Sequence, residues 1–244
     1  MSVADGERSA GGRRSPELES ESESESEGAA AVPLRSLEYV VVDVETTGGT
    51  PRYGHRVTEL AAVRVDLEGR VREEFSTLID PGRPIPAFIT RLTGIDDAMV
   101  RGAPPFATVA GRVRELLDGR VFVAHNASFD WRFVRAEFER AEGRPPAEHV
   151  RRLCTVRLAR RLVPEAGRRS LDALSAHFGI ENDARHRALG DARATVELFA
   201  RLVERLDARG VRYWHEVEEV LLRRGRGSPT VEDAPTLWDQ PKET

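Results

Sequence analysis

Two acidic residues separated by one position close a run of β-favouring side chains in the segment Tyr39-Val40-Val41-Val42-Asp43-Val44-Glu45. The Tyr and Val run has no polar break, which predicts a central strand buried on both faces. Because side chains alternate along a strand, Asp43 and Glu45 point to the same side, about 7 Å apart at a rise of about 3.3 Å per residue. Two such carboxylates repel each other unless a cation lies between them, and their oxygen atoms suit Mg²⁺ or Mn²⁺ better than zinc. The pattern indicates a divalent-metal site, and the alternative is a strand that ends in an acidic turn.

Three further polar residues follow at positions where predicted elements begin. Asp130 comes after the short apolar run 121–124 and falls in the first turn of a predicted helix. His186 and Asp191 lie five residues apart, with Gly190 between them, at the junction of a loop and a long helix. This spacing predicts that Asp191 projects from the first turn of the helix and that His186 hangs from the loop before it. The alternatives are an ordinary first-turn acid favoured by the helix dipole for Asp130, and a solvated loop histidine for His186.

The elements that must position these residues predict an α/β domain with a mixed sheet flanked by helices. Strands alternate apolar residues or form short apolar runs, whereas the helices carry apolar residues at helical spacing. The predicted strands span residues 39–45, 56–66, 71–79 and 121–124. The predicted helices span residues 106–117, 129–141, 151–162, 170–178, 186–206 and 211–222, with short helical turns at 87–92 and 96–100. The first three strands form an antiparallel meander, and the later elements complete a single domain.

Three segments, VVDVETTG, AHNASFD and HRALGDA, resemble the three exonuclease motifs of the DEDDh family of 3′→5′ exonucleases. The segment Leu92-Thr93-Gly94-Ile95 is also similar to a segment that this family carries between its first two motifs. The family has a ribonuclease H-like fold and includes the proofreading epsilon subunit of bacterial DNA polymerase III, together with stand-alone DNA and RNA exonucleases. The resemblance covers about residues 37–208, and three motifs in the right order are much stronger support than any one of them.

The resemblance implies a site with two divalent ions, Mg²⁺ or Mn²⁺, and a histidine as general base. The family pattern assigns the metal ions to Asp43, Glu45, Asp130 and Asp191, and the proton transfer to His186. The residue chemistry agrees, because two metal ions about 3.5–4 Å apart clamp the attacking and leaving oxygens of a phosphodiester. A histidine ordinarily titrates near pH 6.5 and can therefore take a proton from water at neutral pH. Glu59 lies in a strand where many family members carry an acid, and a surface or structural role is its alternative.

Five residues are candidates for contacts with the substrate. The backbone N–H groups of Thr46, Thr47 and Gly48 are expected to bind the 3′-terminal nucleotide, and Phe129 is expected to pack near its base. Asn126 follows the strand 121–124 directly. It is a substrate-contact candidate, and the alternative is that it shapes the end of the strand through backbone hydrogen bonds.

The function expected from the resemblance is that of a metal-dependent 3′→5′ exonuclease. It hydrolyses phosphodiester bonds at single-stranded or frayed DNA 3′ ends and releases nucleoside monophosphates, either proofreading for a DNA polymerase such as polymerase III or acting alone. One alternative is an exoribonuclease of the same family, because the metal site does not distinguish the sugars. The other is a catalytically silent nucleic-acid-binding scaffold, although such a module has no reason to keep four converging acids and a histidine.

Composition limits the other possibilities. The chain has 244 residues, enough for one sizeable core, and its single cysteine, Cys154, allows no internal disulfide. A reducing, cytoplasmic compartment is therefore expected. No apolar run approaches the roughly 20 residues of a membrane span, and no signal-peptide core is visible at the amino terminus. The total charge of −4 comprises −4 in residues 1–36 and −2 in residues 226–244, which leaves +2 for residues 37–225. That middle region can accept a polyanionic substrate.

The ends of the chain are expected to be tails. Residues 1–36, with a Ser/Glu repeat, predict a disordered acidic tail, and residues 37–208 predict the exonuclease domain. Residues 209–225 predict a C-terminal helix, and residues 226–244 a flexible tail. Within that tail, residues 234–238 (Ala-Pro-Thr-Leu-Trp) loosely resemble the motif with which bacterial replication proteins bind the sliding clamp. The alternative is that Leu237 and Trp238 fold back onto the domain.

Overall fold

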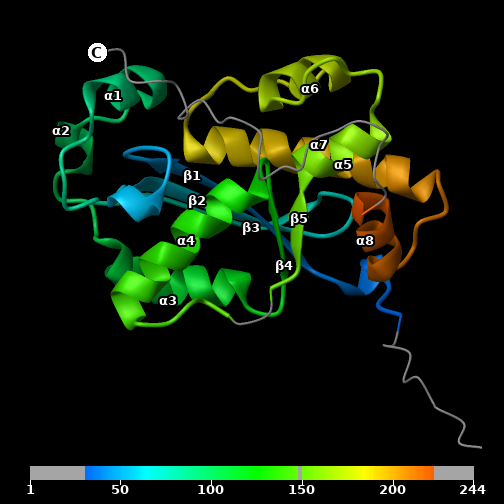
Figure 1. The fold of residues 1–244 in the computed structure, drawn as a ribbon, viewed down its shortest axis with the longest axis horizontal. Helices are drawn as coiled ribbons and strands as arrows, with labels where there is room; N and C mark the ends of the chain where they lie inside the picture. Colours follow the sequence, from blue (N-terminus) through cyan, green and yellow to red (C-terminus); the bar gives the residue numbers. More distant parts are fainter. Residues whose placement is uncertain (1–30, 148–149, 223–244) are drawn as a thin grey trace, which may run out of the picture. The chain divides into compact units, whose positions relative to one another are not determined.

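The computed structural model describes residues 31–147 and 150–222, which contain a five-stranded sheet in the order β3-β2-β1-β4-β5 (Figure 1). The strands are β1 (Tyr39–Thr46), β2 (Val57–Val65), β3 (Val71–Leu78), β4 (Val121–Ala124) and β5 (Arg152–Cys154). β1 pairs antiparallel with β2, β2 pairs antiparallel with β3, and β4 runs parallel to β1 and β5. The mixed sheet predicted from the sequence is therefore confirmed, with β1 at its centre.

Helices cover both faces of the sheet (Figure 1). The α-helices are α1 (Ala87–Thr93), α2 (Asp97–Val100), α3 (Phe106–Leu117), α4 (Ala127–Glu142), α5 (Thr155–Leu162), α6 (Leu171–Phe178), α7 (Ala188–Asp207) and α8 (Trp214–Leu222). Two 3₁₀ turns, η1 (Leu34–Ser36) and η2 (Pro51–Tyr53), flank β1. One apolar cluster packs α3 and α4 on one face, and a second packs α5, α6, α7 and α8 on the other.

The alternation along β1 decides on which face the acids lie. Val40, Val42 and Val44 belong to the cluster with α3 and α4, whereas Tyr39 and Val41 belong to the cluster with α7. Successive side chains of a strand point to opposite faces, so Asp43 and Glu45 continue the row of Tyr39 and Val41. Both acids are therefore directed to the α7 side of the sheet at the carboxyl end of its central strand.

The sequence-based prediction of a helix over residues 151–162 is wrong at its start. Residues 152–154 form β5, which pairs with β4 through Phe122 and Arg152, Val123 and Leu153, and Ala124 and Cys154, and the helix begins only at Thr155. A three-residue strand is too short for its own periodicity to be recognised. Its conformation is fixed by hydrogen bonding to the neighbouring strand.

Both ends of the domain differ from their predicted boundaries. Residues 31–36, predicted as part of the disordered tail, are folded onto the domain, because Leu34 is buried in the cluster with α7. The backbone N–H of Leu34 donates to the carbonyl of Arg212 at 2.9 Å, and that of Trp214 donates to the carbonyl of Val32 at 2.9 Å. The last helix starts at Trp214 and not at residue 211, and it buries Val217.

Three predictions lie outside the described residues: the disorder of the Ser/Glu-rich segment within residues 1–30, the flexible tail over residues 226–244 and the clamp-like segment 234–238. Among the residues that the structure describes, no helix combines the length and the apolar character that crossing a membrane requires.

Candidate metal centre

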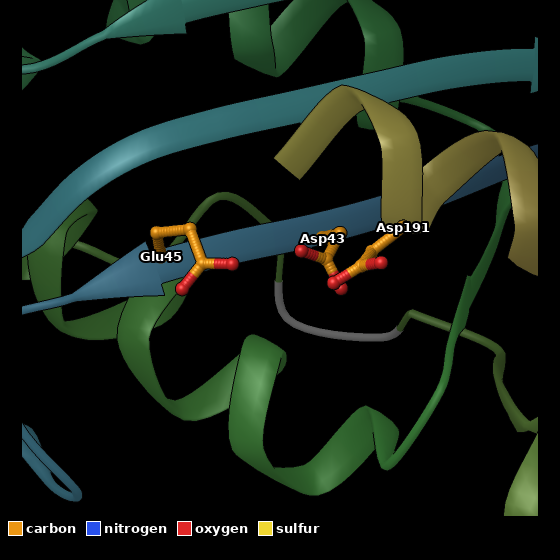
Figure 2. Close-up of side chains that lie close together, drawn as sticks. All are labelled: Asp43, Glu45 and Asp191. Atoms are coloured by element: carbon orange, nitrogen blue, oxygen red, sulfur yellow. The ribbon is translucent and has the colours of Figure 1, made fainter. Parts of the chain in front are cut away.

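Three carboxylates meet between β1 and the start of α7. Asp43 and Glu45 extend from the carboxyl end of β1, and Asp191 extends from the first turn of α7 (Figure 2). One oxygen atom from each of the three side chains lies within 4.8 Å of the other two. The strand and the helix are adjacent because the apolar stripe of α7 packs against β1 and β2, so the fold itself brings the three acids together.

Asp130 lies beside this group and is not a member of it. It occupies the first turn of α4, is only 2% exposed, and accepts a hydrogen bond from the backbone N–H of Val44 at 3.3 Å. β4 runs parallel to β1, and the chain turns at Asn126, which has a φ of 73°, before α4 begins. Because parallel strands end at the same edge of the sheet, this turn delivers Asp130 to the carboxyl end of β1.

Burial and mutual repulsion make the carboxylates of this region hard to ionise together. Burial, followed by repulsion from Asp130, Glu45 and Asp191, raises the pKa of Asp43 well above its usual range. Burial, with repulsion from neighbouring acids, raises the pKa of Glu45 to about 8. Burial likewise raises the pKa of Asp130 to about 8, although two backbone hydrogen bonds act in the opposite direction, and burial raises the pKa of Asp191. A cation among these groups would remove the repulsion and stabilise their ionised form.

The donor set fits a hard divalent cation. The three clustered ligand atoms are all carboxylate oxygens, the donors that Mg²⁺ and Mn²⁺ prefer over the nitrogen and sulfur that favour zinc. Within residues 31–147 and 150–222, no arginine or lysine forms an ion pair with Asp43, Glu45 or Asp191, and Arg187, whose charge acts on Glu45, is paired with Glu59. The cluster is therefore open to a cation that the protein does not itself supply.

Asp191 is oriented by two hydrogen bonds from the loop before α7. The side-chain amide of Asn182 donates to one carboxylate oxygen at 2.6 Å, and the backbone N–H of His186 donates to the other at 3.2 Å. The loop passes so close to the helix that a Cβ at Gly190 would lie 2.2 Å from the carbonyl oxygen of Ala184. Gly190 is thus required where the loop crosses the first turn of α7.

His186 precedes α7 and has a left-handed backbone conformation, with a φ of 57°. This conformation is uncommon for a residue with a side chain and persists only where the surroundings fix it. Sequence reasoning placed His186 before the helix and Asp191 in its first turn, and the structure confirms both positions. The role of Asn182 was missed, because no motif or spacing singles out an asparagine nine residues before the aspartate.

The segment Thr46-Thr47-Gly48 is held by its own hydrogen bonds. The hydroxyl of Thr46 donates to the carbonyl of Gly48 at 2.8 Å, and the backbone N–H of Thr47 donates to the carbonyl of Arg56 at 2.8 Å. The N–H of Thr47 is therefore committed within the protein, contrary to the expectation that it faces the nucleotide. At Gly48 a Cβ would lie 2.3 Å from the ring of His55, which explains why the turn carries glycine.

The other two substrate candidates flank the start of α4. Asn126 takes up the left-handed turn before the helix, and its side-chain oxygen accepts a hydrogen bond from the hydroxyl of Ser128 at 3.2 Å. Phe129 is half-buried, and its ring centroid lies 5.0 Å from that of Phe133. This side-chain contact of Asn126 is not the backbone hydrogen bonding of its alternative role, and both roles stay predictions.

Comparisons with known proteins cover most of the described residues. The family model described as RNase_T, exonuclease, matches residues 40–199. A DNA polymerase III subunit epsilon-like protein of Rhodobacter capsulatus is 44% identical over 200 residues, which are 81% of this chain and 28% of that protein. The 3'-5' exonuclease DinG of Bacillus subtilis is 42% identical over 168 residues, which are 69% of this chain and 18% of that protein. The chain thus spans less than a third of the length of these relatives.

Among solved structures, exonuclease X in complex with 5' overhanging duplex DNA is similar, with a TM-score of 0.57 and 27% identity. The similarity covers 75% of this chain and 99% of that one. The two chains therefore share nearly the whole of the exonuclease X fold.

Proposed function

Because the chain belongs to the RNase_T exonuclease family, we propose that it is a metal-dependent 3′→5′ exonuclease that releases nucleoside monophosphates from DNA 3′ ends. The observation that carries the proposal is the meeting of Asp43, Glu45 and Asp191, whose oxygen atoms lie within 4.8 Å of one another. Three acids from two separate elements repel one another when ionised, and a phosphodiesterase that uses divalent cations gives this arrangement a purpose.

Asp43, Glu45 and Asp191 would hold the first metal ion, and Asp130 beside them would contribute to a second. Bound divalent ions of this kind stabilise the charge on the phosphate and on the attacking and leaving oxygens. Asn182 holds Asp191 in one orientation through its 2.6 Å hydrogen bond, so that this ligand is positioned before substrate arrives.

His186 accepts the proton of the attacking water in this proposal. Its N–H bond to Asp191 and its left-handed backbone hold the histidine at the edge of the acidic cluster. A positioned general base contributes about 10²–10⁴-fold to the rate. Loss of the imidazole should therefore reduce the rate without removing the metal ligands.

DNA is the proposed substrate because of the similarity to exonuclease X, whose solved structure contains 5' overhanging duplex DNA. The proposal extends to a DNA polymerase as partner, since one relative is a DNA polymerase III subunit epsilon-like protein. The catalytic unit in this proposal spans residues 31–222 and is wider than the predicted 37–208. The burial of Leu34 and Trp214 supports the wider limits.

The test uses the full chain and oligonucleotides of one sequence, made as DNA and as RNA, each labelled at the 5′ end. With Mg²⁺ or Mn²⁺, the DNA strand should shorten one nucleotide at a time from its 3′ end and release mononucleotides. A chelator and the variant Asp43→Asn should each stop the reaction. Faster shortening of the RNA strand would overturn the choice of DNA. Cleavage that survives both the chelator and Asp43→Asn would overturn the proposed site.

A further inference from the structure

Glu59 is a buried acid next to the candidate metal centre that has its own set of partners. It lies on β2 directly opposite Glu45 on β1, and it is 4% exposed. Its two oxygens accept hydrogen bonds from Arg187, at 3.0 Å from Nε and 2.8 Å from Nη2, and from the backbone N–H of Ala188 at 2.9 Å. A carboxylate has about four lone-pair sites, and three donors occupy about three of those of Glu59.

The partners of Glu59 are the two residues that follow His186. Ala188 is the first residue of α7, and Arg187 precedes it. The backbone of His186 is therefore held from two sides: its own N–H donates to Asp191, and the next two residues are bound to β2 through Glu59. This double attachment supplies the surroundings that keep His186 at a φ of 57°.

We propose that Glu59 and Arg187 form a positioning pair that fixes His186 and the first turn of α7 against the carboxyl end of β1. The inference rests on the proposed function, in which His186 takes the proton of the attacking water. It assigns Glu59 a role distinct from that of a metal ligand, although Glu59 faces the same side of the sheet as Glu45. Arg187 forms an ion pair with Glu59 and offsets part of the repulsion that Glu59 exerts on Glu45.

The chain contains a matched control on the same helix. Glu74 on β3 accepts two hydrogen bonds from Arg193 of α7, at 2.9 Å from Nε and 2.5 Å from Nη2. This second pair also joins α7 to the sheet through an arginine that makes two hydrogen bonds. Its side chains are more exposed, at 30% for Glu74 and 57% for Arg193. It lies six residues beyond Arg187. Glu74→Gln therefore removes the same chemistry from the same helix without touching the residues around His186.

The first experiment measures kcat and KM on a 5′-labelled single-stranded DNA oligonucleotide with Mn²⁺, for the full chain. Glu59→Gln should reduce kcat on the order of 10²-fold, as expected for a displaced proton acceptor, with KM and Mn²⁺ affinity changed by less than about twofold. Arg187→Gln should also reduce kcat. Arg187→Lys, which keeps the charge but loses the planar geometry that makes two hydrogen bonds, should retain more of the rate than Arg187→Gln. Glu74→Gln should behave as the wild type. Wild-type kcat in Glu59→Gln, or a large fall in Mn²⁺ affinity, would overturn the positioning role.

A double variant tests whether Glu59 acts through His186. If it does, Glu59→Gln should cause almost no further loss of kcat in a His186→Ala background, because residues that act as a unit are not additive. A full additional loss of about 10²-fold in the double variant would show that Glu59 acts elsewhere, and would overturn the inference.

Hydrogen–deuterium exchange followed by mass spectrometry tests the pair without reference to activity. Peptides covering residues 185–191 should exchange faster in Glu59→Gln and in Arg187→Gln than in the wild type, and no faster in Glu74→Gln. Equal exchange in all four proteins would overturn the inference even if the nuclease assay succeeds. If the wild type releases no nucleotides, the proposed function fails, whereas this exchange pattern still decides whether the pair fixes the segment. Arg187 is 41% exposed in its side chain, so its variant provides the second test should Glu59→Gln fold poorly.

Discussion

Two acidic regions of this domain have opposite surroundings. Glu137 on α4 is 1% exposed and accepts hydrogen bonds from Arg56 at 2.7 and 2.8 Å and from the backbone N–H of Val57 at 3.2 Å. Asp43 is partly buried, and the charged groups that dominate its surroundings are other acids, Asp130 and Glu45 first among them. The same residue chemistry therefore serves two purposes. An acid paired with arginine connects the helix to the sheet, whereas acids grouped with other acids repel one another and favour the binding of a cation.

The largest expected effect comes from removing one acid of the unpaired group. Asp43→Asn keeps the shape of the side chain but loses a metal ligand and its charge. The rate should fall at least about 10³-fold, because metal ions contribute several kcal/mol of charge stabilisation and each 1.36 kcal/mol is tenfold. The melting temperature of the metal-free variant should equal or exceed that of the wild type, since repulsion is relieved. A calorimetric scan and a nuclease assay on the same sample check both statements.

The second-largest expected effect is the pH dependence of the stability of the metal-free protein, which the unpaired acids should dominate. Glu45 and Asp130 have folded-state pKa values raised to about 8, so the folded protein binds more protons than the unfolded chain between about pH 4 and pH 8. The free energy of unfolding should therefore fall as pH rises through this window, and the loss is complete above the folded-state values. Mg²⁺ or Mn²⁺ should flatten the slope. Urea denaturation at pH 5, 6.5 and 8, with chelator or with metal, measures the free energy of unfolding as a function of pH. If metal leaves the dependence of this free energy on pH unchanged, the account is contradicted.

Breaking the Glu137–Arg56 pair should lower the stability of the protein and leave its nuclease rate nearly unchanged. Glu137→Gln leaves the guanidinium of Arg56, which is 21% exposed, without its carboxylate. Breaking such a buried pair typically costs 3–5 kcal/mol, and the partial exposure of Arg56 places the expected cost near about 3 kcal/mol. Denaturant titration at pH 7 measures it. The rate at a temperature where the variant is folded should stay within about threefold of the wild type, because the contact touches no proposed ligand.

The smallest predicted effect concerns the residue that orients Asp191. Asn182→Ala removes the 2.6 Å hydrogen bond to one carboxylate oxygen and leaves the bond from His186 N–H to the other. Loss of a group that orients a metal ligand typically costs 10–100-fold in affinity or activity, and the remaining bond favours the lower end, about tenfold. Titration of activity with Mn²⁺ should show a higher midpoint, and Asp183→Ala serves as the control from the same loop. An unchanged midpoint in Asn182→Ala would contradict the claim that Asn182 orients Asp191 for metal binding.

The sequence was sufficient to predict the place of a site residue where that place follows from its position along a single strand or helix. Asp43 and Glu45 had to share a face of β1, and Asp191 had to begin α7, so the positions of these three acids and the family membership were predictable. The predicted set of four metal ligands also includes Asp130, which lies outside the group of three whose oxygens are within 4.8 Å of one another. The contacts that depend on tertiary structure were not predictable. β5 exists only because β4 offers hydrogen bonds to three residues, and the N–H of Thr47 is occupied by Arg56 from the next strand. Likewise, nothing in local spacing pairs Asn182 with Asp191.

The most direct test of the central claim is calorimetric titration of Mn²⁺ into the metal-free chain at pH 7 in two buffers of different ionisation enthalpy. The account predicts binding that releases protons, because acids with raised pKa values must ionise as the cation enters. It also predicts that Asp43→Asn abolishes the tight binding and that Glu137→Gln preserves it. Binding of equal strength in the wild type and in Asp43→Asn, or binding without proton release, would contradict the claim that the unpaired acids form the metal centre.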